Sequence, residues 1–147
     1  MLDFRPSIPS DLPCVMEIWR AAVDATHDFL ATGDRDAIEA ELLGFFPQVS
    51  LLLAVDGSDA PLGFMFLHEG HLEALFADPD QHGKGIGKAL VHKALAAHPD
   101  LTVDVNEQNP KALGFYEHLG FEQIGRSALD GQGRPYPLIH LRRRADS

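Results

Sequence analysis

Three glycines at alternate positions, Gly83, Gly85 and Gly87, stand between a strand-like run and a helical pattern. The run before them, Leu72 to Ala77, is apolar and ends at Pro79. A strand that enters a helix through glycines presents free backbone N–H groups and the positive end of the helix dipole at one point. This feature predicts an α/β fold in which a phosphate or similar anion binds where the helix begins.

Two familiar phosphate-binding loops do not match this segment. A Walker A loop requires glycine at position 82 and Ser or Thr after Lys88, and the chain has His82 and Ala89 there. The dinucleotide fingerprint has a different glycine spacing and follows a parallel strand, whereas the strands expected here are antiparallel. A tight turn with close helix packing explains three glycines alone about as well as a phosphate site does.

The remaining chain alternates strand and helix patterns. Strands are expected at 2–6, 51–55, 62–67, 72–77, 101–105, 121–127 and 136–141, and helices are expected to begin near Asp11, Asp34, Ile86 and Pro110. Ser10 is expected to cap the first helix. Ile38, Leu42 and Phe45 form the expected buried side of the second helix. The order predicts an α/β (α+β) fold, with a mixed, mostly antiparallel sheet of six or seven strands flanked by about four helices.

Composition narrows the class of protein. With 147 residues, 45% of them apolar, the chain is expected to form one domain spanning 1–147. The formal net charge of −10 argues against nucleic-acid binding and favours cationic or neutral small partners. No apolar run approaches the length of a membrane span and no signal peptide is evident, so a cytoplasmic protein is expected. The single cysteine, Cys14, fits a reducing compartment and a packing role.

A metal site is not expected. His68 and His71 are three residues apart in a strand region, which places them on opposite faces of the strand. The other histidines outside the glycine loop have no ligand spacing, and surface positions are expected for His92, His98, His118 and His140.

A longer pattern resembles a known family. Leu75 to Pro79, the glycine loop through Leu90, Asn106 with Asn109, and the segment from Ala112 to Phe121 resemble the GNAT superfamily of acetyl-CoA dependent N-acetyltransferases. The resemblance covers essentially the whole chain and is greatest to small bacterial single-domain members. It implies transfer of an acetyl group from acetyl-CoA, as co-substrate, to a primary amine by direct attack.

The resemblance also implies positions for the coenzyme. The pyrophosphate would bind at His82, Gly83, Lys84, Gly85, Ile86, Gly87 and Lys88, where His82 replaces the Gln or Arg usual in the family. Backbone N–H groups near Phe76 and Ala77 would polarise the thioester carbonyl. The pantetheine arm would be lined by Asn106, Asn109, Ala112 and Phe115. Asn109 is equally well explained as a helix cap, and Phe115 as a packing residue.

Catalytic roles are implied for three residues. Tyr116 matches the tyrosine that often lies near the coenzyme sulfur, where a phenol can protonate the leaving thiolate. His71 aligns with the family's usual base position and would take the proton of the amine. Glu73 lies two residues further on the same strand face and is the other candidate. A water chain, with His71 at a strand end for structural reasons, is a third reading.

The acceptor is not identified by the sequence. Trp19, His27, Phe29 and Tyr136 are expected to line its pocket, although a Trp on an apolar helix face is more often a core residue. A small molecule or a peptide could supply the amine, and the chain could be a monomer or a homodimer. The alternative function is an acyl-CoA-binding sensor with little turnover.

Overall fold

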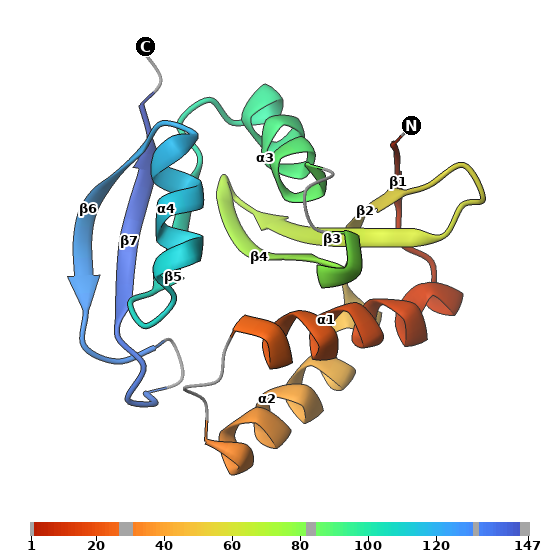
Figure 1. Cartoon of the computed structure of the whole chain (residues 1–147), viewed down its shortest axis with the longest axis horizontal. Coiled ribbons are helices and arrows are strands. Elements are labelled where there is room, and N and C mark those ends of the chain that lie inside the picture. The colour runs from red at the N-terminus through yellow and green to blue at the C-terminus, as the bar shows by residue number, and fades with distance from the viewer. Residues whose placement is uncertain (1, 27–30, 82–84, 131–132, 145–147) are drawn as a thin grey trace. The chain divides into compact units, whose positions relative to one another are not determined.

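The structure is a computed structural model that describes residues 2–26, 31–81, 85–130 and 133–144 (Figure 1). The seven strands are β1 (Asp3–Pro6), β2 (Leu52–Val55), β3 (Pro61–His68), β4 (His71–Ala77), β5 (Thr102–Asn106), β6 (Phe121–Ser127) and β7 (Leu138–Arg143). The four α-helices are α1 (Leu12–Thr26), α2 (Thr32–Phe45), α3 (Ile86–Ala97) and α4 (Pro110–His118). Short 3₁₀ turns occupy Pro9–Asp11, Phe46–Gln48 and Pro79–Gln81.

The sheet is mixed, as the sequence predicts. The strands hydrogen-bond in the order β1-β2-β3-β4-β5-β7-β6. The β1–β2, β2–β3, β5–β7 and β6–β7 pairs are antiparallel, and β4 pairs with β5 in parallel at two positions. The predicted α/β class, strand number and helix number are therefore confirmed.

The chain divides into two compact units. The first contains residues 1–66 and 74–90, and the second contains residues 67–73 and 91–147. β4 contributes its first three residues to the second unit and the rest to the first.

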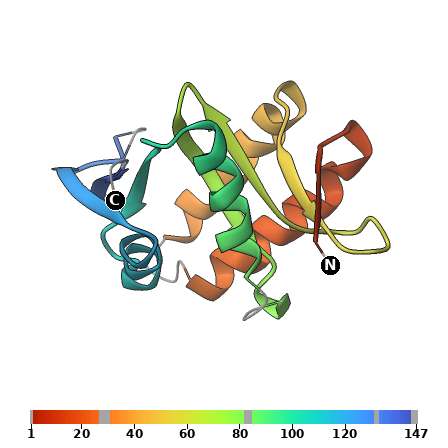
Figure 2. The same ribbon diagram turned by 90° about the horizontal axis from the view of Figure 1, so that it is seen from above.

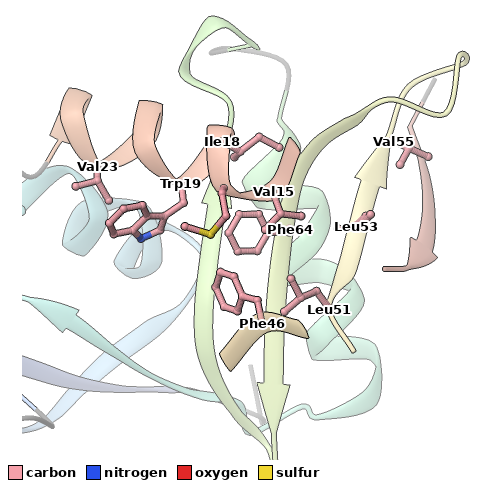
Figure 3. Packing of buried hydrophobic residues seen from close by; sticks show 10 residues of the cluster. Val15, Ile18, Trp19, Val23, Phe46, Leu51, Leu53, Val55 and Phe64 are labelled. Atoms are coloured by element: carbon pink, nitrogen blue, oxygen red, sulfur yellow. The ribbon is translucent and has the colours of Figure 1, made fainter. Parts of the chain in front are cut away.

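The first unit has an apolar core around α1 (Figure 3). Its buried members are Val15, Met16, Ile18, Trp19, Val23, Phe46, Leu51, Leu53, Val55 and Phe64. The residues of α1 recur at the helical period that the sequence displays. Phe46 and Phe64 meet edge to face, with ring centroids 5.5 Å apart.

Two expectations about the first two helices are wrong. Ser10 lies inside the 3₁₀ turn and does not cap a helix; instead the Asp11 carboxylate accepts the Ile8 N–H at 2.8 Å. Phe45 is exposed, and its neighbour Phe46 enters the core because the helix ends between them and the chain changes direction. Ile38 and Leu42 pack against the core as expected.

The second unit places α4 beside β5 and β6 (Figures 1 and 2). Gly120 ends α4 with a φ of +95°, which is the left-handed conformation expected of a glycine at this position. Val103 and Val105 on β5 are buried, while Thr102 and Asp104 alternate with them on the other face.

No helix among the residues described above has the length and apolarity required to cross a membrane.

Candidate active site

The start of α3 carries the described part of the expected phosphate site. Gly85 has a φ of +71°, and a Cβ added there would meet no atom of the described residues within 4 Å, its two chain neighbours aside. Its carbonyl accepts the Ala89 N–H at 2.9 Å, so helical bonding begins at this residue. The first-turn N–H groups of a helix have no partner within the helix and suit an anion, which is the chemistry a pyrophosphate requires. His82, Gly83 and Lys84 lie outside the described residues.

A glycine that sequence reasoning missed positions the end of β4. A Cβ at Gly63 on β3 would lie 2.8 Å from Cγ2 of Ile86 and 3.0 Å from the Phe76 carbonyl oxygen. Glycine therefore lets β3, the start of α3 and the Phe76–Ala77 segment approach one another within the first unit. A glycine inside a strand pattern was the available signal.

The two asparagines expected at the coenzyme support local turns in the second unit. The Asn109 side chain accepts the Ala112 N–H at 3.2 Å and caps α4, with Pro110 in the first turn. The Asn106 side chain accepts the Gln108 N–H at 3.0 Å. Both side-chain oxygens thus organise the β5–α4 connection, and the side-chain NH₂ groups are the donors left for a ligand.

Tyr116 lies on α4 and is 6% exposed. Its ring meets Phe115 and Phe121 edge to face, at centroid distances of 5.0 and 5.3 Å. Burial raises the pKa of Tyr116, so the phenol stays protonated at neutral pH. A buried phenol of this kind is a proton donor and not a base. Ala112 and Phe115 are half-buried on the same helix.

His71 begins β4 and is paired directly to Thr102 in the parallel β4–β5 ladder. Its Nδ1 lies 2.7 Å from Thr102 Oγ1, and its Nε2 lies 3.4 Å from Asp104 Oδ2. Both ring nitrogens thus face side chains of β5. Glu73 is exposed on the same strand.

His140 has a side chain that is 31% exposed, and it belongs to a polar chain on one face of the second unit. His140 Nδ1 lies 2.6 Å from Asp104 Oδ1, and His140 Nε2 lies 2.6 Å from Ser127 Oγ. Asp104 therefore bridges two imidazoles.

Sequence reasoning missed Thr102, Asp104 and Ser127. Alternation with Val103 and Val105 could have placed Thr102 and Asp104 on one face of a strand. Their neighbours were not foreseeable, because β4 and β7 come to β5, and β6 comes to β7, from separate parts of the chain.

The expected acceptor residues are only partly described. Trp19 is a core residue of the first unit, with the Arg35 guanidinium 5.6 Å from its ring centroid. Tyr136 is buried in the second unit, and its N–H donates to the Arg134 carbonyl at 2.8 Å. His27 and Phe29 lie outside the described residues. Within the described ranges, no group of three or more His, Cys, Asp or Glu side chains is arranged to hold a metal ion.

Comparison with known proteins identifies the class. The family model described as an acetyltransferase (GNAT) domain matches residues 22–133, and the chain belongs to this family of acetyltransferases.

The relatives found include YjaB proteins. The chain is 48% identical to the peptidyl-lysine N-acetyltransferase YjaB of Salmonella typhimurium over 96% of this chain and 97% of the relative. The solution structure of apo-form YjaB from Escherichia coli has a TM-score of 0.92 and 44% identity, covering 97% of each chain. The PaiA N-acetyltransferase of Thermoplasma acidophilum, solved with coenzyme A, shares the fold with a TM-score of 0.74 at 18% identity, over 95% of this chain and 98% of that one. The expected likeness to small bacterial single-domain acetyltransferases of this family is confirmed.

Proposed function

We propose that this acetyltransferase moves the acetyl group of acetyl-CoA to the side-chain amine of lysine in a peptide or protein. The observation that carries the choice of acceptor is the 48% identity, over nearly the full length of both chains, to a peptidyl-lysine N-acetyltransferase. The net charge of −10 supports it, because an acidic protein attracts a cationic lysine side chain.

The coenzyme would bind through the glycine loop and the start of α3. The left-handed Gly85 and the first-turn N–H groups of α3 suit the pyrophosphate. Acetyl-CoA would supply the acetyl group as a thioester. Backbone N–H groups near Phe76 and Ala77 would stabilise negative charge on the carbonyl oxygen. Asn106, Asn109, Ala112 and Phe115 would line the rest of the coenzyme.

Tyr116 would be the general acid. Burial raises the pKa of Tyr116, so the phenol carries its proton at neutral pH and can donate it to the departing sulfur.

His71 would be the general base, and Glu73 is the alternative. A lysine ammonium has a pKa of about 10.4 and must lose its proton before it can attack a thioester. His71 is half-buried and is held between Thr102 and Asp104. Glu73 is exposed and could instead anchor the cationic acceptor.

A coenzyme-release assay with lysine peptides tests the proposal. Each peptide carries a blocked N-terminus, so that the lysine side chain is the acceptor amine, and a peptide with arginine in place of lysine is the control. Release of coenzyme together with a mass gain on lysine supports the proposed function. Binding of acetyl-CoA without turnover on any amine tested would favour a coenzyme-binding sensor instead.

Matched variants assign the base. We expect His71→Ala to abolish the rise of kcat/KM with pH that a base produces, and Glu73→Gln to retain it. Loss of activity in Glu73→Gln with an intact profile in His71→Ala would reverse the two roles. An unchanged profile in both variants would point to water as the base.

A further inference from the structure

The second unit contains a polar chain of four side chains, His71–Asp104–His140–Ser127. These residues come from four strands, β4, β5, β7 and β6, and their side chains lie on one face. Hydrogen bonds of 2.6 Å join Ser127 Oγ to His140 Nε2 and His140 Nδ1 to Asp104 Oδ1. The other carboxylate oxygen, Asp104 Oδ2, lies 3.4 Å from His71 Nε2, close enough for charge attraction but longer than the two hydrogen bonds.

Strand register builds this chain. Asp104 is directly opposite His140 in the β5–β7 pair, and His71 is beside Thr102 in the β4–β5 pair. The β6–β7 register shifts between Gln123 and Gly125, so that Ser127 lies opposite Leu138. Without this bulge, the alternation along β6 would turn Ser127 to the opposite face.

The proton positions in the chain follow from its donors and acceptors. An ionised carboxylate only accepts hydrogen bonds, so His140 Nδ1 carries a hydrogen toward Asp104. Neutral His140 then accepts the Ser127 hydroxyl proton at Nε2. The same carboxylate favours a hydrogen on His71 Nε2, because a lone pair there would face a negative charge. Neutral His71 then has its lone pair on Nδ1, which accepts the Thr102 hydroxyl proton.

Other charged groups share this face. By register and alternation they are Glu73 on β4, Arg142 on β7 and Glu122 on β6. Arg142 lies opposite both Thr102 and Glu122, two residues along β7 from His140 of the polar chain. Asp104 is the charged group on this face that contacts both imidazoles, His140 at 2.6 Å and His71 at 3.4 Å.

We propose that Asp104, held by His140, is a positioning residue that fixes the hydrogen of His71 on Nε2 and makes Nδ1, through Thr102, the proton-accepting atom. This inference rests on the proposed function, in which His71 is the base. In the step, the amine gives one proton to Thr102 Oγ1 while the Thr102 hydroxyl proton passes to His71 Nδ1. The amine becomes neutral, the imidazole becomes a cation beside Asp104, and Thr102 is unchanged.

The first test needs no turnover. ¹⁵N spectra of histidine-labelled protein without coenzyme report which ring nitrogen carries the hydrogen. We expect His71 in the wild type to be in the Nε2–H form, and Asp104→Asn to convert it to a mixture of forms. Glu122→Gln, which removes a carboxylate from the same face outside the chain, is the matched control and should leave the His71 signals unchanged. Identical His71 spectra in the wild type and Asp104→Asn would overturn the proposal.

The second test is kinetic. Asp104→Asn should lower kcat by about 10–10³-fold, approaching the range of lost general base catalysis, while the affinity for acetyl-CoA stays the same. His140→Gln should lower kcat less, since it acts one residue further away, and Glu122→Gln should retain wild-type kcat. An unchanged kcat in Asp104→Asn would overturn the proposal.

The two tests separate this inference from the proposed function. If wild-type protein acetylates no amine, the proposed function fails, and the spectra alone decide on the positioning role of Asp104. If wild-type protein is active and His71→Ala keeps full activity, the base assignment fails and this inference fails with it. If His71→Ala is inactive while Asp104→Asn matches the wild type in kcat and spectra, only this inference is overturned.

Discussion

Tyr116 is nearly completely buried and carries a phenol hydroxyl, and the contribution of this hydroxyl to catalysis can be measured. Tyr116→Phe removes one hydroxyl and keeps the ring contacts with Phe115 and Phe121. We expect kcat to fall by about 10²–10⁴-fold with little change in coenzyme affinity, because the lost group acts on the leaving thiolate. Steady-state kinetics and calorimetry measure the two effects. A near-normal kcat would leave Tyr116 a packing role only.

The pH dependence provides a second prediction for the same residue. An acid must be protonated to act, and burial raises the pKa of Tyr116 above the ordinary tyrosine value of about 10. We therefore expect no loss of kcat as pH rises from about 9 to 10. A decline centred on the ordinary tyrosine value would contradict the raised pKa.

The charge of the Asp11 carboxylate should make the free energy of unfolding depend on pH. Its carboxylate accepts two hydrogen bonds from the Arg5 guanidinium at 2.8 and 2.9 Å, and this interaction lowers the pKa of Asp11. A lowered pKa stabilises the fold above the unfolded value of about 4, and the contribution is lost as pH falls through the folded pKa.

Asp11→Asn tests this sign. We expect a loss of about 1.5–3 kcal/mol in the free energy of unfolding at pH 7, and a smaller difference from wild type at pH 3. Urea denaturation at both pH values measures it. Asp59→Asn, which removes a more exposed partner of the same Arg5, should cost less than about 1 kcal/mol. Equal losses at both pH values for Asp11→Asn would contradict the ion-pair explanation.

At the scale of elements, two glycines act where β4 leads into α3: Gly63 on β3 and Gly85 at the start of α3. Gly63 permits the approach of β3, and a Cβ at Gly85 would meet no atom within 4 Å in the part of the chain that the structure describes, chain neighbours aside. Gly85→Asp introduces both a side chain at a left-handed φ of +71° and a negative charge beside the predicted phosphate site. We expect acetyl-CoA affinity to fall by more than about tenfold, or 1.4 kcal/mol, in a protein that still folds.

Gly44→Ala is the control for this prediction. Gly44 lies in α2, and a Cβ there meets no atom within 4 Å. Alanine should stabilise this helix by about 0.5–1 kcal/mol without changing coenzyme affinity. Calorimetry on both variants is the measurement, and unchanged affinity in folded Gly85→Asp would remove the phosphate site from the start of α3.

At the scale of the whole molecule, the net charge of −10 should affect how strongly the protein attracts its peptide acceptor. A cationic lysine peptide is attracted by an acidic protein, and salt screens this attraction beyond a Debye length of about 10 Å at 0.1 M. We expect kcat/KM for a basic lysine peptide to fall by about tenfold between low and high salt. A lysine peptide with acidic flanks should show a weaker or opposite dependence. Equal salt dependence for both peptides would argue against electrostatic attraction of the acceptor.

Much of the fold was predictable from local patterns. The strand runs, the helical periodicity of α1 and α3, Asn109 with Pro110, and Gly120 each carry a signal within a few residues. The sequence prediction was wrong where two adjacent residues are equally suited to one core position. Phe45 and Phe46 are chemically identical, and only the place where α2 ends determines which one enters the core.

In the candidate site, too, some residues could be predicted from local sequence and others could not. The glycine loop, Tyr116 and His71 were recognisable in the sequence, since short motifs or a position relative to such a motif carry them. The contacts of Asp104 with His71 and with His140 depended on strand order, and the contact of His140 with Ser127 depended on a one-residue shift in the β6–β7 register. Local sequence determines which face of a strand a residue occupies, because side chains alternate. Which residue from a distant strand lies beside it is decided only when the sheet assembles, because register is set by packing between segments far apart in the chain.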